Sequence, residues 1–129
     1  MIELFKKHKT EKPPYLERMD ELEKLTIVRL KGPLDQTTIP IVESRIQENR
    51  KHGSKIDKNV VIDFAKVVHV DSAMIAFHII HLREFQEKGF QIAFINISAE
   101  MRVFMDMFKV KEDFRVFASE AEAVRELNK

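Results

Sequence analysis

The chain has 129 residues and a formal net charge of +1, with 33% charged and 44% hydrophobic residues. This length predicts one domain, and the small net charge argues against a broad nucleic-acid-binding surface. The absence of cysteine excludes disulfides, thiolate zinc sites and cysteine nucleophiles. The longest apolar run, residues 73–77, is far shorter than the roughly 20 residues of a membrane span, and the first residues contain no signal-peptide core. We therefore expect a soluble, cytoplasmic protein without a membrane span.

Residues 1–14 are expected to form a flexible arm, followed by one domain over residues 15–129. Lysine dominates residues 6–12, and Pro13 and Pro14 make a stiff break before the domain. The arm also contains apolar residues that could contact the domain or a membrane surface: Ile2, Leu4 and Phe5.

Strand-like and helical patterns alternate along the rest of the chain. Segments rich in β-branched and other apolar residues predict strands at 15–19, 25–31, 59–64, 90–96 and 115–117. The pair Gly32-Pro33 is expected to end the second of these strands. Helical periodicity and capping residues predict helices at 38–51, 72–88 and 99–108, and a last helix that opens with the capping pattern Ser119-Glu120-Ala121-Glu122.

From residue 25 onward the predicted order is βαβαβαβα. This order favours parallel strands joined by right-handed helical crossovers. We therefore predict a single α/β domain with a mostly parallel sheet of four to five strands and about four helices.

The helix expected at 72–88 is apolar on two faces. One face follows the 3.6-residue period and predicts core packing, with His78 at its edge; it comprises Ile75, Ile79, Leu82 and Phe85. Met74, Phe77 and His81 lie on a second face at spacings of three and four. A helix that is apolar on two sides is either covered twice or presents one side to a partner. Both explanations remain open at this point.

Asp71 and Ser72 stand at the junction between a strand and this helix. Asp71 is a good helix N-cap, because its carboxylate can accept amide hydrogen bonds and complements the helix dipole. Ser72 then becomes the first helical residue, where a phosphate on its hydroxyl is tolerated by the free amides. In open α/β sheets the carboxyl ends of the strands are also where ligands gather.

Three groups of motifs resemble one known family. Gly32-Pro33-Leu34-Asp35 follows a strand and Val70-Asp71-Ser72 precedes a helix. The closing motifs are Phe104-Met105-Asp106-Met107-Phe108-Lys109-Val110, Phe114-Arg115-Val116-Phe117-Ala118-Ser119 and Glu122-Ala123. In order and spacing, residues 15–127 resemble the STAS domain (sulfate transporter and anti-sigma factor antagonist).

This resemblance implies a non-catalytic binding switch without a cofactor. In such antagonists, an anti-sigma factor that is also a serine kinase phosphorylates the serine after the aspartate, which is Ser72 here. The unmodified protein binds the anti-sigma factor and thereby frees a sigma factor, and a PP2C-type phosphatase resets the switch. Asp35 would lie beside Ser72. The residues expected to bind the partner are Asp35, Asp71, Ser72, Ala73, Met74, Phe77 and His81.

The segment after Ser72 departs from the family pattern. The family commonly continues Asp-Ser-Ser-Gly-Leu-Gly, whereas this chain has Asp71-Ser72-Ala73-Met74-Ile75-Ala76. Met74 and Ala76 in place of glycines predict a bulkier and more apolar docking surface. Two alternatives remain open: a constitutive STAS subunit of a transporter or other assembly, in which Ser72 is only a helix residue, and a small-ligand site in the same crevice. Self-association as a homodimer is also left open.

Other site chemistries find less support in the sequence. His78 and His81 are three residues apart and His69 precedes them on a strand, whereas helical zinc pairs usually lie four apart, so no metal site is expected. A serine hydrolase would need small residues around Ser72, where Val70 and Ala73 stand. The isolated glycines also provide no phosphate-binding loop.

Overall fold

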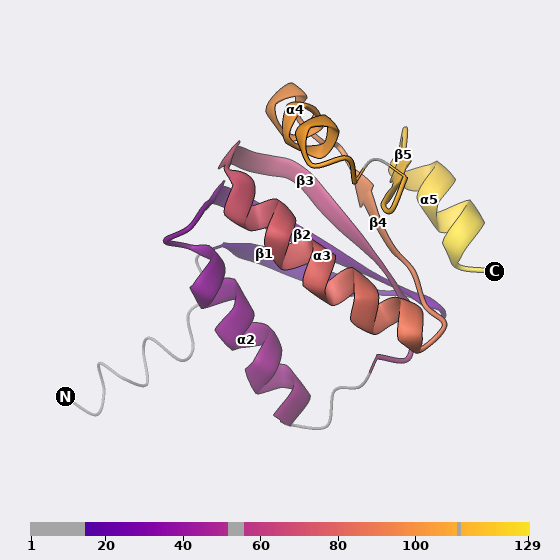
Figure 1. Cartoon of the computed structure of the whole chain (residues 1–129). Helices are drawn as coiled ribbons and strands as arrows, with labels where there is room; N and C mark the ends of the chain where they lie inside the picture. Colours follow the sequence, from indigo (N-terminus) through magenta and orange to yellow (C-terminus); the bar gives the residue numbers. More distant parts are fainter. Residues whose placement is uncertain (1–14, 52–55, 111) are drawn as a thin grey trace.

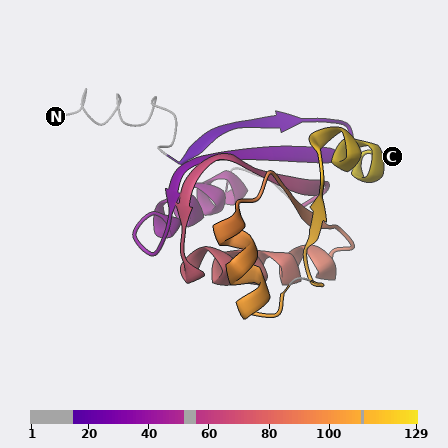
Figure 2. The same cartoon turned by 90° about the horizontal axis from the view of Figure 1, so that it is seen from above.

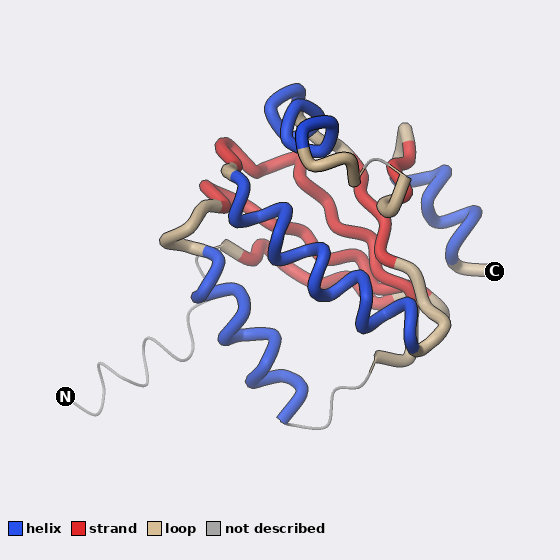
Figure 3. Tube along the Cα trace, in the orientation of Figure 1, coloured by secondary structure: helices blue, strands red, loops and turns tan. Residues whose placement is uncertain are grey.

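The computed structural model describes residues 15–51, 56–110 and 112–129, so the expected arm at residues 1–14 lies outside the described residues. The elements in chain order are β1 (Leu16–Glu21), β2 (Leu25–Leu34), α2 (Ile39–Lys51), β3 (Asn59–Val70), α3 (Ser72–Glu87), β4 (Ile92–Ile95), α4 (Ala99–Met107), β5 (Arg115–Phe117) and α5 (Glu120–Leu127). Figure 1 shows their arrangement, and Figure 3 shows the same view coloured by helix and strand.

The five strands form one sheet in the order β1-β2-β3-β4-β5. β1 pairs antiparallel with β2, and all the other neighbouring strands are parallel. The predicted single α/β domain with a mostly parallel sheet is therefore confirmed. Because β1 runs opposite to β2, it begins at the end of the sheet where β2 and β3 finish.

β2 and β3 are longer than the sequence predicted. The expected end of β2 at Gly32-Pro33 is wrong, since pairing with β3 continues to Leu34 opposite Val70. The register shifts between Gly32 and Pro33, and Gly32 has a φ of 72°. These irregularities let the strand continue past a proline that cannot donate a ladder hydrogen bond.

Helices cover both faces of the sheet (Figure 2). The larger core packs α3, α2 and α4 against one face and includes Leu34, Ile62, Phe64, Met74, Ile75, Phe94 and Met101. The smaller core lies between the other face and α5 and includes Leu25, Ile27, Val61, Ala93, Ile95, Phe117 and Leu127. β4 is buried along its whole length, because its alternate side chains enter the two cores.

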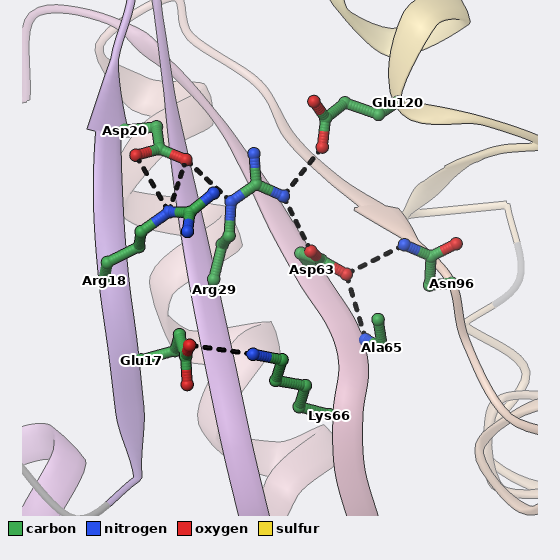
Figure 4. Close-up of polar contacts among 9 residues, drawn as sticks. All are labelled: Glu17, Arg18, Asp20, Arg29, Asp63, Ala65, Lys66, Asn96 and Glu120. Carbon is green, nitrogen blue, oxygen red and sulfur yellow. Dashed lines mark hydrogen bonds and ion pairs between the residues drawn. The ribbon is translucent and has the colours of Figure 1, made fainter.

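An ion-pair network fastens β1 and α5 to the sheet, centred on Arg29 of β2 (Figure 4). Arg29 contacts Asp20 at 2.7 Å, Asp63 at 2.8 Å and Glu120 at 2.7 Å. The hydrogen bond to Glu120 is the main cause that raises the pKa of Arg29. Burial would raise the pKa of Asp63, but hydrogen bonds from Asn96, the Ala65 amide and Arg29 outweigh it and lower that pKa.

Candidate functional site

Ser72 is exposed at the first position of α3, directly after the end of β3. Asp71 caps the helix with an extended backbone, and its Oδ1 accepts a hydrogen bond of 2.9 Å from the Ala73 amide. The short side chain at Asp71 competes well for the free amides of the first turn, which is why the helix begins here. The predicted N-cap is confirmed.

The second carboxylate oxygen of Asp71 holds the loop between β2 and α2. Asp71 Oδ2 accepts a hydrogen bond of 3.0 Å from the amide of Gln36, and the Asp71 amide donates to the Leu34 carbonyl at 3.3 Å. One side chain therefore positions two segments that are 35 residues apart in sequence. The sequence contained no signal for this second role.

Asp35, at the start of the same loop, accepts hydrogen bonds from the loop residues that follow it. Its Oδ1 accepts hydrogen bonds from the Thr37 hydroxyl at 2.6 Å, the Thr37 amide at 2.9 Å and the Thr38 amide at 3.1 Å. The Thr37 hydroxyl is the largest of the causes that lower the pKa of Asp35, so this carboxylate is ionised near neutral pH. The Thr38 hydroxyl, which is buried, donates to the Pro33 carbonyl at 2.9 Å.

A third acidic residue, Glu100 at the start of α4, lies near this site. Its Oε1 accepts a hydrogen bond of 3.0 Å from the Val70 amide and lies 3.0 Å from His69 Nδ1. Glu100 thus ties α4 to the end of β3, two residues before Ser72 (Figure 1). Sequence reasoning missed it, although an acidic residue in the first turn of the helix after a buried strand was a weak signal. We call the surface formed by Asp35, Gln36, Asp71, Ser72 and Glu100 the Ser72 edge.

Asp35 and Asp71 have no cationic partner among the residues that the structure describes. The carboxylate oxygens of both residues accept hydrogen bonds from backbone amides, and Asp35 also accepts one from the Thr37 hydroxyl. Glu100 faces the half-exposed ring of His69, which is cationic only when it is protonated. The Ser72 edge is therefore an acidic surface, and its two aspartates are not paired with a cation among the described residues.

Met74, Phe77 and His81, which were expected to bind the partner, do not form an outward face of α3. Met74, Phe77 and His81 are all buried, with Met74 fully enclosed in the larger core. α2 packs beside α3, and Glu43 of α2 lies 3.2 Å from His81 Nε2. Of the two explanations for an apolar second face, coverage by another helix applies here. In this structure these three side chains therefore offer little or no area to a partner.

Of the two residues that stand in place of the family glycines, Met74 is buried and Ala76 is exposed. Met74 points into the core, Ala73 is half-buried and Ala76 is exposed. Ile80 is 66% exposed one turn further along, so the outward stripe of α3 runs from Ser72 through Ala76 to Ile80. The stripe offers a partner small side chains followed by one large apolar side chain.

The three histidines that the structure describes, His69, His78 and His81, lie in different surroundings. The described residues contain no group of three or more histidine, aspartate or glutamate side chains placed to hold a metal ion. His78 is buried among the rings of Phe64, Phe77 and Phe94, and its Nε2 has no hydrogen-bond partner in the part of the chain that the structure describes. Burial, with a smaller contribution from His81, lowers the pKa of His78 to about 3, so His78 is a neutral core residue.

The STAS domain family model matches residues 18–123, which is most of the chain. The chain belongs to the STAS domain family. No curated protein sequence matches it. Several solved structures share this fold at sequence identities of 10% to 19%.

One similar structure is a proposed anti-sigma factor antagonist from Thermotoga maritima, with a TM-score of 0.73, 10% identity, and coverage of 87% of this chain and 94% of that one. The anti-sigma factor antagonist SpoIIAA in its phosphorylated form, a Bacillus cell fate determinant, gives a TM-score of 0.63 at 18% identity, over 84% and 96% of the two chains. The murine anion transporter Slc26a9 gives a TM-score of 0.65 at 19% identity and matches 97% of this chain, but only 24% of its own length. In this STAS protein, no helix among the described residues is long and apolar enough to cross a membrane.

Proposed function

We propose that this STAS domain is a non-catalytic regulatory module that binds a protein partner through the Ser72 edge and is switched by phosphorylation of Ser72. The observation that carries the proposal is the exposed Ser72 at the start of α3, directly after Asp71, whose carboxylate also holds the loop that contains Asp35. The similarity to anti-sigma factor antagonists, one of them solved in a phosphorylated form, supports the same function.

The switch follows from charge. A phosphate adds about −1.5 to −2 charges at neutral pH. The positive end of the α3 helix dipole tolerates this charge, so the fold is kept. An interface that must bury the phosphate near Asp35 and Asp71 pays a like-charge and desolvation penalty, and each ~1.4 kcal/mol of that penalty lowers affinity tenfold. Phosphorylation therefore releases a partner without unfolding the domain.

The proposed partners are an anti-sigma factor that is also a serine kinase and a PP2C-type phosphatase that removes the phosphate. The kinase needs the Ser72 hydroxyl within reach of its own active site, which the exposed first turn of α3 allows. The outward stripe of Ala76 and Ile80 supplies apolar contact area beside it.

The experiment is phosphorylation by the anti-sigma-type serine kinase encoded nearest to this chain, followed by intact-protein mass spectrometry. One phosphate is expected, and it should be absent in Ser72→Ala but present in Ser44→Ala, which removes an exposed serine of α2. Binding of the unmodified kinase should weaken at least tenfold in Ser72→Glu. Absence of phosphate together with unchanged binding of Ser72→Glu would contradict the proposal.

A second candidate is a constitutive STAS subunit of a transporter assembly. The similarity to Slc26a9, which extends over nearly the whole chain, favours it. In that case Ser72→Glu should assemble with its partner as well as the unmodified chain does, because Ser72 would be only the first residue of α3. Co-purification of both forms with a transporter encoded beside this chain distinguishes the two functions.

A further inference from the structure

We propose that two copies of this chain pair antiparallel through the outer edge of β1, about a two-fold axis at Met19. Their two five-stranded sheets would then form one continuous sheet. β1 lies at the border of the sheet, because among the described strands it pairs only with β2 (Figure 2). A free strand edge is a template for another strand unless its side chains oppose the pairing. The side chains of β1 instead complement those of an identical strand.

The backbone of β1 presents the hydrogen-bonding groups that this pairing needs. At the turn into β2 the Leu22 amide donates to the Leu25 carbonyl at 2.8 Å, which marks a hydrogen-bonded pair. Such pairs alternate with non-hydrogen-bonded ones along an antiparallel ladder, so the backbone groups of Asp20 face β2, and those of Met19 and Glu21 face outward. A two-fold axis at Met19 therefore joins its amide and carbonyl to the same groups of the second copy.

The charged side chains of β1 select this register. Arg18 and Asp20 lie on one face of the sheet, with side chains 57% and 36% exposed (Figure 4). About an axis at Met19, each Arg18 lies opposite Asp20 of the second copy, at non-hydrogen-bonded positions where side chains come closest. Arg18 uses its Nε–H on Asp20 of its own strand and has further N–H donors for the second copy. An axis at Arg18 or Asp20 would instead place two arginines or two aspartates opposite each other.

The other face of the paired strands adds an apolar contact. Met19 is 43% exposed on this face, and it would contact Met19 of the second copy. Glu17 and Glu21 would lie opposite each other across the two copies, but each of them already has a cation. Lys66 lies 2.8 Å from Glu17, and Lys58 lies 3.4 Å from Glu21. These lysines reduce the repulsion between the opposed glutamates.

The pairing leaves the Ser72 edge of each copy free. A two-fold axis perpendicular to the strands reverses the direction of every strand in the second copy. Ser72 directly follows the end of β3, so the two Ser72 edges would lie at opposite ends of the combined sheet. Each copy could then meet its own protein partner, although the pairing itself does not rest on the proposed function.

Sedimentation of the full chain between about 1 μM and 1 mM tests the pairing. β1 has six residues, so the interface is small and a weak, concentration-dependent dimer is expected. Arg18→Glu turns both cross-strand attractions into repulsions and should raise the dissociation constant of the dimer about tenfold or more. The matched control Arg102→Glu makes the same charge change at an exposed arginine of α4 and should leave that constant unchanged.

The absence of cysteine allows a second test, which reports on the register. In Met19→Cys the two introduced cysteines would face each other at a Cα separation of about 5.5 Å, within the range of a disulfide. Mild oxidation should therefore cross-link the dimer. Ile80→Cys, at an exposed position of α3, should not cross-link under the same conditions.

A monomer at every concentration would overturn the proposal and leave the edge of β1 to a strand of another protein. A dimer that tolerates Arg18→Glu, or that cross-links equally well through Ile80→Cys, would place the interface elsewhere and refute the proposal too. None of these measurements involves a kinase, so their failure is distinct from a failure of the phosphorylation experiment.

Discussion

Asp71 accepts the Gln36 amide on one carboxylate oxygen and the Ala73 amide on the other. The start of α3 and the loop before α2 are therefore held by a single side chain. Ser72 directly follows Asp71 in the chain, so the shape of the surface around it depends on Asp71. This relation makes Asp71 a positioning residue for the proposed switch.

Replacing Asp71 should lower the stability of the domain and loosen the loop that contains Gln36. For Asp71→Ala we expect a loss of about 1–2 kcal/mol in the free energy of unfolding, because a helix cap is removed and the Gln36 amide loses its acceptor. Urea denaturation measures the loss, and hydrogen exchange should show faster exchange at Gln36. Asp71→Asn keeps one oxygen acceptor and should lose less; equal losses in the two variants would contradict the capping role.

A negative charge at position 72 should leave the fold almost unchanged. An acidic side chain at the start of a helix gains roughly 0.3–1 kcal/mol from the helix dipole, and repulsion from the adjacent Asp71 opposes that gain. We therefore expect the free energy of unfolding of Ser72→Glu to lie within about 1 kcal/mol of the unmodified value. A destabilisation above about 2 kcal/mol, measured by thermal or urea unfolding, would mean that phosphorylation acts on folding and not on docking.

His78 should make the domain sensitive to acid. Its pKa is about 3 in the folded chain, against 6.5 when unperturbed. Above pH 6.5 the ring is neutral in both states; as the pH falls toward 3, the unfolded state binds the proton first and stability declines by about 1.4 kcal/mol per unit. Carboxylates contribute to acid unfolding too, so the comparison with His78→Leu is decisive. The variant should lose less stability between pH 6.5 and 4, and identical pH profiles would refute the prediction.

Removal of Arg29 should be costly because Asp63 would remain buried without its cation. Asp63 is only 9% exposed at its side chain, and breaking a buried pair from one side costs roughly 3–5 kcal/mol. We expect Arg29→Ala to lose about 3 kcal/mol of unfolding free energy and to loosen α5, which Glu120 anchors. The matched control is Lys66→Ala, which breaks an exposed pair with Glu17 and should cost about 1 kcal/mol or less.

Much of the fold could be predicted because the signals are local. The caps at Asp71, Ser98 and Ser119 each accept an amide two or three residues ahead, which short-range spacing reveals. The end of β2 was misjudged for the opposite reason. Gly32-Pro33 is a local stop signal, and pairing with a distant strand overrode it.

The sequence by itself determined the order of the elements, the mostly parallel sheet and the place of Ser72 at the start of a helix. Hydrophobic periodicity and helix capping depend on neighbours within about one helical turn. Both patterns can therefore be recognised in the sequence without knowledge of the fold. Only the tertiary structure decided that Met74, Phe77 and His81 are buried and that α2 lies beside α3, since the sequence of an apolar helix face does not reveal which element packs on it. It also decided the contacts of Asp71 with Gln36 and of Arg29 with Asp63 and Glu120, whose partners lie 34 to 91 residues apart. Such pairs are specified by strand order and register, which bring distant side chains within hydrogen-bonding distance.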